Sequence, residues 1–474
     1  MTPVDGHNIK AERTTRATQK DRTTMSALTD AFRGNRLFAR VLRSSSWLVL
    51  GYGGGQALRL VSNLILTRLL FPEAFGLMTL VSVVTVGLMM FSDVGIGPAI
   101  AQNRRGDDPS FLNTAWTMQL FRGFLLWGAA CALAAPMARF YDAPDLILYL
   151  PIAGISLAIA GFNPTRIETA HRHLLVGRLT GLDLASQFIG IASMILLAWA
   201  TQSVIALVIG GVIGTVARLA LTHRYLPGPR NRFHWEQDAA AELIHFGKWI
   251  FLSTAFWFIS SQGDKAILGK FLSLEMLGIY NIGYFLASFP LLLGHAVTQR
   301  LMIPVYREAP PGAAPENRGK LRRLRIVLSL GIMALLGAMA FAGPWLVDLL
   351  YDDRYAQAGA IMVVLACALI PQVVGMTYDQ AALAAGDSRG FFVFSSSRAI
   401  IQMLFLLLGI TQFGLLGALV GLGLSIFLVH PILIWLARRH EAWDPAHDLI
   451  AGLGGLVLIA LALWLHRDVV MAFG

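Results

Sequence analysis

LLFPEAFGLMTLVSVVTVGLMMFSDVGIG, residues 69–97, sets the architecture of this chain. A first apolar helix is expected to end at Leu70, and a second one to begin directly after a turn at Phe71–Pro72–Glu73. Pro72 cannot donate a backbone hydrogen bond and biases Phe71 away from the helical conformation. The chain should therefore reverse direction here, between two long apolar helices.

The same pattern returns in the second half of the chain, in KFLSLEMLGIYNIGYFL from Lys270. Equivalent positions carry similar residues: Glu73, Gly76 and Leu77 in the first copy, and Glu275, Gly278 and Ile279 in the second. Further anchors keep the same order: Tyr141–Asp142 with Tyr351–Asp352, Glu168 with Asp379, and Arg178 with Arg389. Chance similarity between apolar hairpins is the alternative. Several anchors in one register instead predict one long unit repeated in the same order.

Composition identifies the class of protein. Of 474 residues, 56% are hydrophobic and only 14% are charged, with a mean hydropathy of +0.62. A soluble domain cannot bury that much apolar surface, and each helical membrane crossing needs about 20 apolar residues. A transmembrane barrel would instead show short segments of alternating residues. The fold class is therefore predicted to be an all-α polytopic membrane protein.

Thirteen apolar runs are expected to form helices, in two sets of six and one additional run. This grouping predicts a basic, disordered tail at 1–43, an N-terminal six-helix lobe at 44–222, a connector at 223–242, a C-terminal six-helix lobe at 243–440 and an additional helix within 441–474. Because six crossings return the chain to its starting side, both lobes should insert in the same orientation. Such parallel repeats leave a cavity between two lobes.

Lys and Arg are concentrated in alternate loops, which sets the orientation. With the N-terminal tail in the cytoplasm, outer loops and helix ends hold Arg68, Arg139, Lys265, Lys270, Arg354 and Arg467, and the inner loops hold most of the remaining cations. The first helix is expected to remain as an uncleaved signal anchor. The net charge of +10 then reflects topology and contact with membrane lipids, and nucleic-acid binding is not expected.

Four cations lie within apolar runs: Arg59, Arg122, Lys248 and Arg398. A charge near the middle of the bilayer costs at least a few kcal/mol unless it faces a partner or a wet cavity. These four are therefore the candidate substrate-binding residues. For Lys248, extension of the side chain to the inner surface is the competing interpretation, and for Arg122 and Arg398 it is a structural ion pair.

Three acidic residues near helix ends, Asp93, Asp183 and Asp264, are candidates for ion coupling. The acidic group at Asp348, Asp352 and Asp353 is interpreted as a loop feature. Cys131 and Cys367 lie in apolar runs without metal-ligand or redox spacing. No nucleotide, hydrolase or zinc-protease motif is present. We therefore predict no metal site, no cofactor and no enzymatic activity.

The motifs LFPEAFGLMTLVSVV, FSDVGIGPAIAQ, FLSLEMLGIYNIGYFLASFP and LMIPVYRE resemble polysaccharide exporters of the lipid-linked oligosaccharide flippase (Wzx-like) type. These belong to the multidrug/oligosaccharidyl-lipid/polysaccharide (MOP) flippase superfamily. The resemblance extends from about Arg43 to His440. Family members usually have twelve or fourteen helices, so the thirteen runs leave the side of the C-terminus open.

The resemblance implies that the chain moves undecaprenyl-diphosphate-linked oligosaccharide across the bacterial inner membrane for exopolysaccharide, capsule or O-antigen synthesis. It also implies rocking lobes around a cationic cavity. A polysaccharide polymerase and a chain-length regulator are the expected protein partners. Two alternatives remain: a drug/cation antiporter of the same fold, which would favour buried acids, and a membrane polysaccharide polymerase, which would need a long outer loop.

Overall fold

A computed structural model describes residues 37–92, 95–173, 175–308 and 310–471. These residues form an all-helical molecule with no strand among them, so the predicted fold class is confirmed. The first half contains α2 (Leu37–Leu69), α3 (Pro72–Met90), α4 (Ile96–Gln102), α5 (Pro109–Phe140), α6 (Leu146–Gly161), α7 (Arg166–Arg172), α8 (Val176–Thr201) and α9 (Ile205–Tyr225). The second half contains α10 (Gln237–Phe271), α11 (Leu274–Glu308), α12 (Pro315–Leu350), η1 (Asp353–Tyr355), α13 (Gln357–Gly375), α14 (Asp379–Ala384), α15 (Ser388–Arg439), α16 (Pro445–Leu465) and α17 (Arg467–Met471).

Each predicted apolar run overlaps a helix of the structure. Within the described ranges, nine helices are long and apolar enough to cross a membrane, or ten if the bent pair α6 and α7 counts as one span. Of the predicted tail at 1–43, residues 1–36 lie outside the described residues, and residues 37–43 are helical because α2 begins at Leu37. The start of α3 agrees with the sequence argument, because Pro72 occupies its first turn together with Glu73. Proline and an acidic residue both favour a helix N-terminus.

The longest helix, α15, is two helices joined by a sharp reversal. Phe413 and Gly414 leave the helical conformation, and Gly414 has φ +62°. Beyond this point Gly417 approaches the backbone of Gly409, so the chain folds back on itself. We call residues 388–412 the first arm and residues 415–439 the second arm. They correspond to the two apolar runs that the sequence predicts here.

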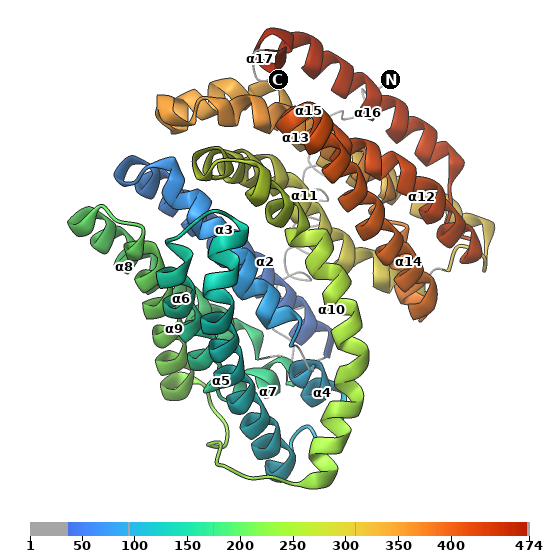
Figure 1. Ribbon diagram of the computed structural model, residues 1–474. Helices are drawn as coiled ribbons and strands as arrows, with labels where there is room; N and C mark the ends of the chain where they lie inside the picture. The colour runs from blue at the N-terminus through green and yellow to red at the C-terminus, as the bar shows by residue number, and fades with distance from the viewer. Residues whose placement is uncertain (1–36, 93–94, 174, 309, 472–474) are drawn as a thin grey trace, which may run out of the picture.

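The two halves show matching neighbour relations. Helix α2 packs on α8, as α10 packs on α15, and α5 packs on α6, as α12 packs on α13. Figure 1 shows α5–α9 on one side of the molecule and α12–α16 on the other, with α3 and α11 between them. A parallel repeat requires these equivalences. The repeat and the lobe boundaries remain predictions from the sequence.

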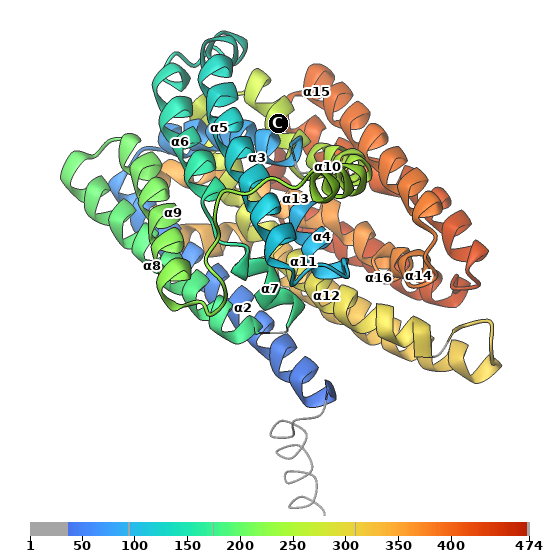
Figure 2. The same ribbon diagram turned by 90° about the horizontal axis from the view of Figure 1, so that it is seen from below.

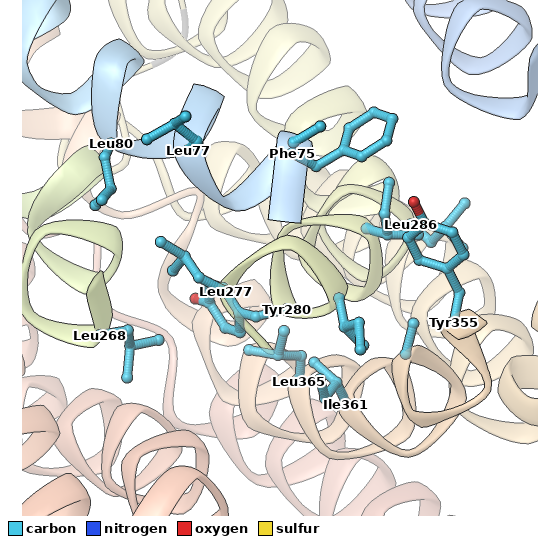
Figure 3. Packing of buried hydrophobic residues seen from close by; sticks show 14 of the residues in the cluster. Phe75, Leu77, Leu80, Leu268, Leu277, Tyr280, Leu286, Tyr355, Ile361 and Leu365 are labelled. Carbon is cyan, nitrogen blue, oxygen red and sulfur yellow. The ribbon is translucent and has the colours of Figure 1, made fainter. Parts of the chain in front are cut away.

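Helices α3 and α11 meet through a reciprocal contact between two glycines. A methyl group on Gly76 would overlap the carbonyl of Leu274, and one on Gly278 would overlap the carbonyl of Pro72. Buried side chains of α3, α11 and α13 surround this contact, among them Leu77 and Tyr280 (Figure 3). The glycines therefore allow the two backbones to approach closely where the halves join.

Two polar contacts join the halves near this glycine pair. Lys270 Nζ lies 2.7 Å from Asp142 Oδ2, and Arg354 Nη2 donates to the carbonyl of Thr67 at 2.8 Å. We call this end of the molecule the Pro72 end. In the predicted topology it is the outer end.

The connector between α9 and α10 lies against the first half (Figure 2). Arg166 donates to the carbonyl of Leu226 at 2.7 Å, and the backbone of Arg232 donates to Asn113 Oδ1 at 3.0 Å. At its far end Glu236 forms an ion pair with Arg105 at 2.8 Å, directly before α10 begins. Because α10 begins at Gln237, the last part of the predicted connector is helical.

Candidate functional site

Arg398 lies in the first arm of α15, ten residues beyond Ser388. At the usual helical rise this places its Cα about 15 Å along the helix, and a bilayer core is about 30 Å thick. The side chain is half-buried. A guanidinium at this depth requires polar surroundings, since an unpartnered charge in hydrocarbon is costly.

Arg398 lines a cavity of about 40 Å³, which we call the Arg398 cavity. Helices α11, α13 and α14 and both arms of α15 form its walls. Its polar lining residues are His295, Gln372, Asp379, Gln402, Ser425 and His430. A cavity needs roughly 10–15 Å³ to hold one water, so this one has room for a few waters or a small polar group.

The break between α13 and α14 brings an acid to this cavity. Helix α13 ends at Gly375, and α14 begins with Asp379, whose Oδ1 accepts a hydrogen bond from Gln380 at 2.9 Å. Asp379 interacts electrostatically with Arg398, although the described residues show no direct ion pair between them. Opposite, Gln372 Nε2 lies 3.0 Å from His295 Nε2. The guanidinium therefore keeps hydrogen-bonding capacity for a ligand.

A second cavity, of about 170 Å³, lies between α13, the second arm of α15 and α16. We call it the α16 cavity. Its lining is mainly apolar, including Ile370, Phe427 and Leu456, and its ionisable lining residues are His430 and Asp448. His430 also lines the Arg398 cavity, so one imidazole borders both spaces.

Asp448 is the centre of a polar cluster in the first turn of α16. It accepts hydrogen bonds from Tyr378 at 2.6 Å and from Trp443 at 2.9 Å. His430 Nε2 lies 3.2 Å from the same carboxylate, and His447 Nδ1 lies 3.5 Å from it. We call these five residues the Asp448 cluster. It connects α16 to α15 and to the segment between α13 and α14.

Of the other predicted cations, Arg59 and Arg122 line neither cavity. Arg59 is exposed on α2. Arg122, on α5, donates to the carbonyl of Met89 at 2.6 Å and to Ser92 at 3.0 Å, so it contacts the carboxyl end of α3. A cation is favourable at that end of a helix. Lys248 belongs to α10, but its side chain lies outside the described residues. Of the three predicted cations whose side chains are described, only Arg398 lines a described cavity. The roles of Arg59, Arg122 and Lys248 remain predictions.

The predicted coupling acids are dispersed. Asp183 on α8 forms an ion pair with Arg218 on α9 at 2.8 Å. Asp264 on α10 is 3% exposed and accepts a hydrogen bond from Tyr280 at 2.6 Å. Asp93 lies outside the described residues. None of these contacts tests ion coupling, which remains a prediction for all three.

Sequence reasoning did not select His295, His430 or Asp448, and it used Asp379 only as a repeat anchor. A signal for His430 exists, since it is an ionisable residue inside an apolar run. Asp448 lies at the start of its run, where an acid is an ordinary helix-start residue. Its role depends on packing between helices, which no local pattern reveals.

The described ion pairs at the connector affect carboxyl pKa values outside the membrane-spanning helices. Hydrogen bonds from Arg105 and then Ser110 lower the pKa of Glu236 to about 2. A hydrogen bond from His173 lowers the pKa of Asp107. Asp107 is exposed and Glu236 is half-buried, and both hold loops together at the end opposite the Pro72 end.

Comparisons with known proteins agree with this architecture. A family model described as polysaccharide biosynthesis protein matches residues 65–360. The teichuronic acid biosynthesis protein of Bacillus subtilis is 20% identical over 66% of this chain and 64% of its own length. The succinoglycan biosynthesis transport protein of Rhizobium meliloti is 21% identical over 69% of this chain and 65% of its own length. The matches thus span slightly less than two thirds of these relatives.

Solved structures share the fold. The lipid II flippase MurJ in an inward closed conformation superposes with a TM-score of 0.67 and 11% identity, over 90% of this chain and 97% of that one. An inward-facing multidrug resistance transporter of the MATE family gives 0.64 and 14%, over 82% and 95%. An outward-facing MATE structure gives 0.57. The resemblance seen in the sequence is confirmed: the chain belongs to the polysaccharide biosynthesis protein family and has the fold of MOP-superfamily transporters.

Proposed function

We propose that this chain is a flippase that moves undecaprenyl-diphosphate-linked oligosaccharide units across the bacterial inner membrane, with the N-terminus in the cytoplasm. The observation that carries the proposal is the Arg398 cavity, an arginine-lined space deep in the bundle of a polysaccharide biosynthesis family member. The names of the relatives support a role in polysaccharide biosynthesis and transport. The MurJ-like fold supports a lipid-linked cargo.

Arg398 would bind the diphosphate. A guanidinium offers planar pairs of N–H donors that match phosphate oxygens, and these charge-assisted bonds are about twice as strong as neutral ones. Gln372 and Gln402 can add neutral hydrogen bonds to phosphate or sugar oxygens. The lipid tail need not enter the cavity, because it can remain in the bilayer while the head group crosses.

Alternating access would supply the transport step. In the described conformation the halves are held together at the Pro72 end by the Gly76–Gly278 contact and by Lys270–Asp142. In the predicted topology this end faces outward, so the conformation suits loading from the cytoplasmic leaflet. Release on the outer side would require these contacts to separate.

Reconstituted flipping tests the proposal. In proteoliposomes containing a fluorescent prenyl-diphosphate sugar, we expect Arg398→Gln to lower the flipping rate by about ten- to hundredfold, since hydrogen bonds to charged groups contribute about 1.5–3 kcal/mol. Arg439→Gln is the matched control, because Arg439 lies on the same helix, is 56% exposed and pairs with Asp387. Equal flipping by Arg398→Gln and wild type would overturn the assignment.

Asp379 is the observation that favours a second candidate, a drug/cation antiporter. A half-buried acid in a cavity could bind a cation, and MATE multidrug transporters share the fold. The two candidates make opposite predictions for Asp379→Asn. A cation carrier should lose binding of its cargo, whereas a diphosphate carrier should bind its anion at least as tightly.

A further inference from the structure

Between the Arg398 cavity and the α16 cavity lies a His–Asp pair that neither half of the predicted repeat supplies alone: His430 lines both cavities, and Asp448 lines the α16 cavity. His430 comes from the second arm of α15, nine residues before Arg439, which is about 14 Å at the helical rise. Its partner Asp448 comes from α16, the additional helix. The two side chains are 26% and 14% exposed. Membrane-embedded ionisable pairs are rare and costly unless they serve a function.

The carboxylate is held as an anion by its donors. Tyr378 at 2.6 Å and Trp443 at 2.9 Å each donate to Asp448, and neither ring can accept a proton from it at ordinary pH. The remaining close partners are two imidazoles, His430 Nε2 at 3.2 Å and His447 Nδ1 at 3.5 Å, and of these only His430 lines a described cavity. Imidazole is the side chain that gains and loses a proton between about pH 5 and 8. A proton added to this pair would therefore reside on His430.

Protonation of His430 changes the charge facing the cavity. With neutral His430, the ionised groups are Arg398 and Asp379 at the Arg398 cavity and Asp448 at the adjoining α16 cavity, one positive and two negative. The two acids therefore offset part of the attraction of Arg398 for an incoming anion. When His430 gains a proton, forming one N–H bond on its ring, the positive and negative charges balance. An anion bound beside Arg398 then experiences less repulsion.

Other titratable groups face the pair from each neighbouring helix. His295 on α11 contacts Gln372 across the Arg398 cavity. On α12, Ser329 hydrogen-bonds buried His447 at 3.0 Å, and the Arg325 guanidinium lies 4.7 Å from the Tyr378 ring centre. His447 lies 3.0 Å from the Tyr378 hydroxyl and is fully buried, so it has no direct access to the cavity. His295 is therefore the competing proton acceptor, and the test must include it.

We propose that the His430–Asp448 pair is a proton-binding site whose occupancy is linked to anion binding at Arg398, so that the anionic cargo binds together with a proton. This inference rests on the proposed function, because it takes a diphosphate as the ligand of Arg398. Linkage is reciprocal: the proton strengthens anion binding by the same factor by which the anion strengthens proton binding. The linkage concerns binding and assigns no direction to ion flow.

Calorimetric binding of a prenyl-diphosphate sugar to the full chain in nanodiscs tests the linkage. Both phosphates of this probe are esterified, so the probe itself does not titrate near neutral pH. Repeating the titration in two buffers of different ionisation enthalpy counts the protons taken up. For wild type we expect proton uptake on binding, and an affinity that rises about fivefold or more from pH 8 to pH 6, within the usual range of coupling.

Two substitutions should shift the affinity in opposite directions. His430→Gln can still donate to Asp448 but cannot gain a proton, so it should show the weak, high-pH affinity at every pH and no proton uptake. Asp448→Asn removes the negative charge, so it should show the strong, low-pH affinity even at pH 8. A merely structural role would weaken binding in both variants.

His440→Gln is the matched control, since His440 forms the same type of pair with Asp387, at 3.0 Å, on the same helix but outside the cavity. It should keep the wild-type proton uptake. Binding that depends on Arg398 but shows no proton uptake, or uptake that survives His430→Gln and disappears in His295→Gln, overturns this inference and leaves the proposed function intact. Failure of wild type to bind the probe overturns both.

Discussion

At the scale of single residues, two glycines determine how closely the halves approach. Gly76 and Gly278 hold equivalent positions in the repeated motif, and each lies against the carbonyl at the start of the other's helix. Because the obstacle is backbone rather than a flexible side chain, an added methyl group cannot be accommodated by a rotamer change. Replacing one of these glycines with alanine therefore measures how much the close approach of the helices contributes to stability.

We expect Gly278→Ala to destabilise the protein by about 1–3 kcal/mol, the usual cost of overpacking. Thermal unfolding in detergent measures this as a lower midpoint. Gly128→Ala is the matched control: Gly128 lies in α5 with no atom near its Cβ position, and alanine there should be neutral or stabilising by up to about 1 kcal/mol. Equal midpoints for the two variants would contradict the close-contact argument.

Residues differ in how far the sequence predicts them. The chain reversal at Pro72 follows from covalent geometry, and the deep position of Arg398 follows from counting along an apolar run. The sequence does not predict that Arg59 is exposed or that Arg122 contacts the end of α3. Both depend on which face of a helix meets which neighbour. The role of Asp448 at the centre of its cluster is not predictable from the sequence for the same reason.

At the scale of elements, the connector is attached to the first half by its last residue before α10. Arg105 and Ser110 bind Glu236 and lower its pKa to about 2 from its ordinary value of 4.5. A carboxylate with a depressed pKa contributes its stabilisation fully above the ordinary value. That contribution is lost as the pH falls towards the depressed one.

We therefore expect hydrogen-exchange protection factors in residues 226–236 to stay constant from neutral pH down to about 4.5, and to fall between there and about 2. Glu236→Gln should lower protection already at neutral pH, because the ion pair with Arg105 is lost. Asp238→Asn is the control, since Asp238 is exposed in the first turn of the same helix. Unchanged protection in Glu236→Gln would argue against the attachment.

The sequence predicts the long helices better than it predicts the breaks within the apolar runs. The runs that gave α2 to α16 are long and apolar, and the reversal at Gly414 falls in the gap between two of them. The breaks after α6 and after α13 lie inside predicted runs instead. The break after α13 places Asp379 at the cavity; Pro371 and Gly375 lie directly before it, but neither residue fixes where an apolar run is interrupted.

At the scale of the whole molecule, polar contacts at the Pro72 end join the two halves. Arg354 donates to the carbonyls of Thr67 at 2.8 Å and Leu70 at 3.3 Å, across the two halves. Lys270 reaches Asp142 in the same region. Both contacts are partly exposed, so each contributes modestly.

We expect the double variant Arg354→Gln/Lys270→Gln to raise the population open at the Pro72 end by about twofold or more, since the exposed Lys270–Asp142 ion pair contributes about 0.2–1 kcal/mol and the Arg354 hydrogen bonds to the Thr67 and Leu70 carbonyls add to it. Spin labels at Ile147 and Leu349, exposed positions on α6 and α12, report the separation of the halves there. A longer distance component should appear. An unchanged distance distribution would show that the glycine contact alone keeps this end closed.

The reciprocal glycine contact also limits how such a chain can be recombined. Each half supplies a glycine, Gly76 or Gly278, and the backbone carbonyl that packs against the glycine of the other half. A hybrid gene that joins one half to its counterpart from a distant relative would therefore assemble only if both partners keep this geometry. Divergence at this contact is constrained jointly, so the two halves are expected to tolerate change there only in matched pairs.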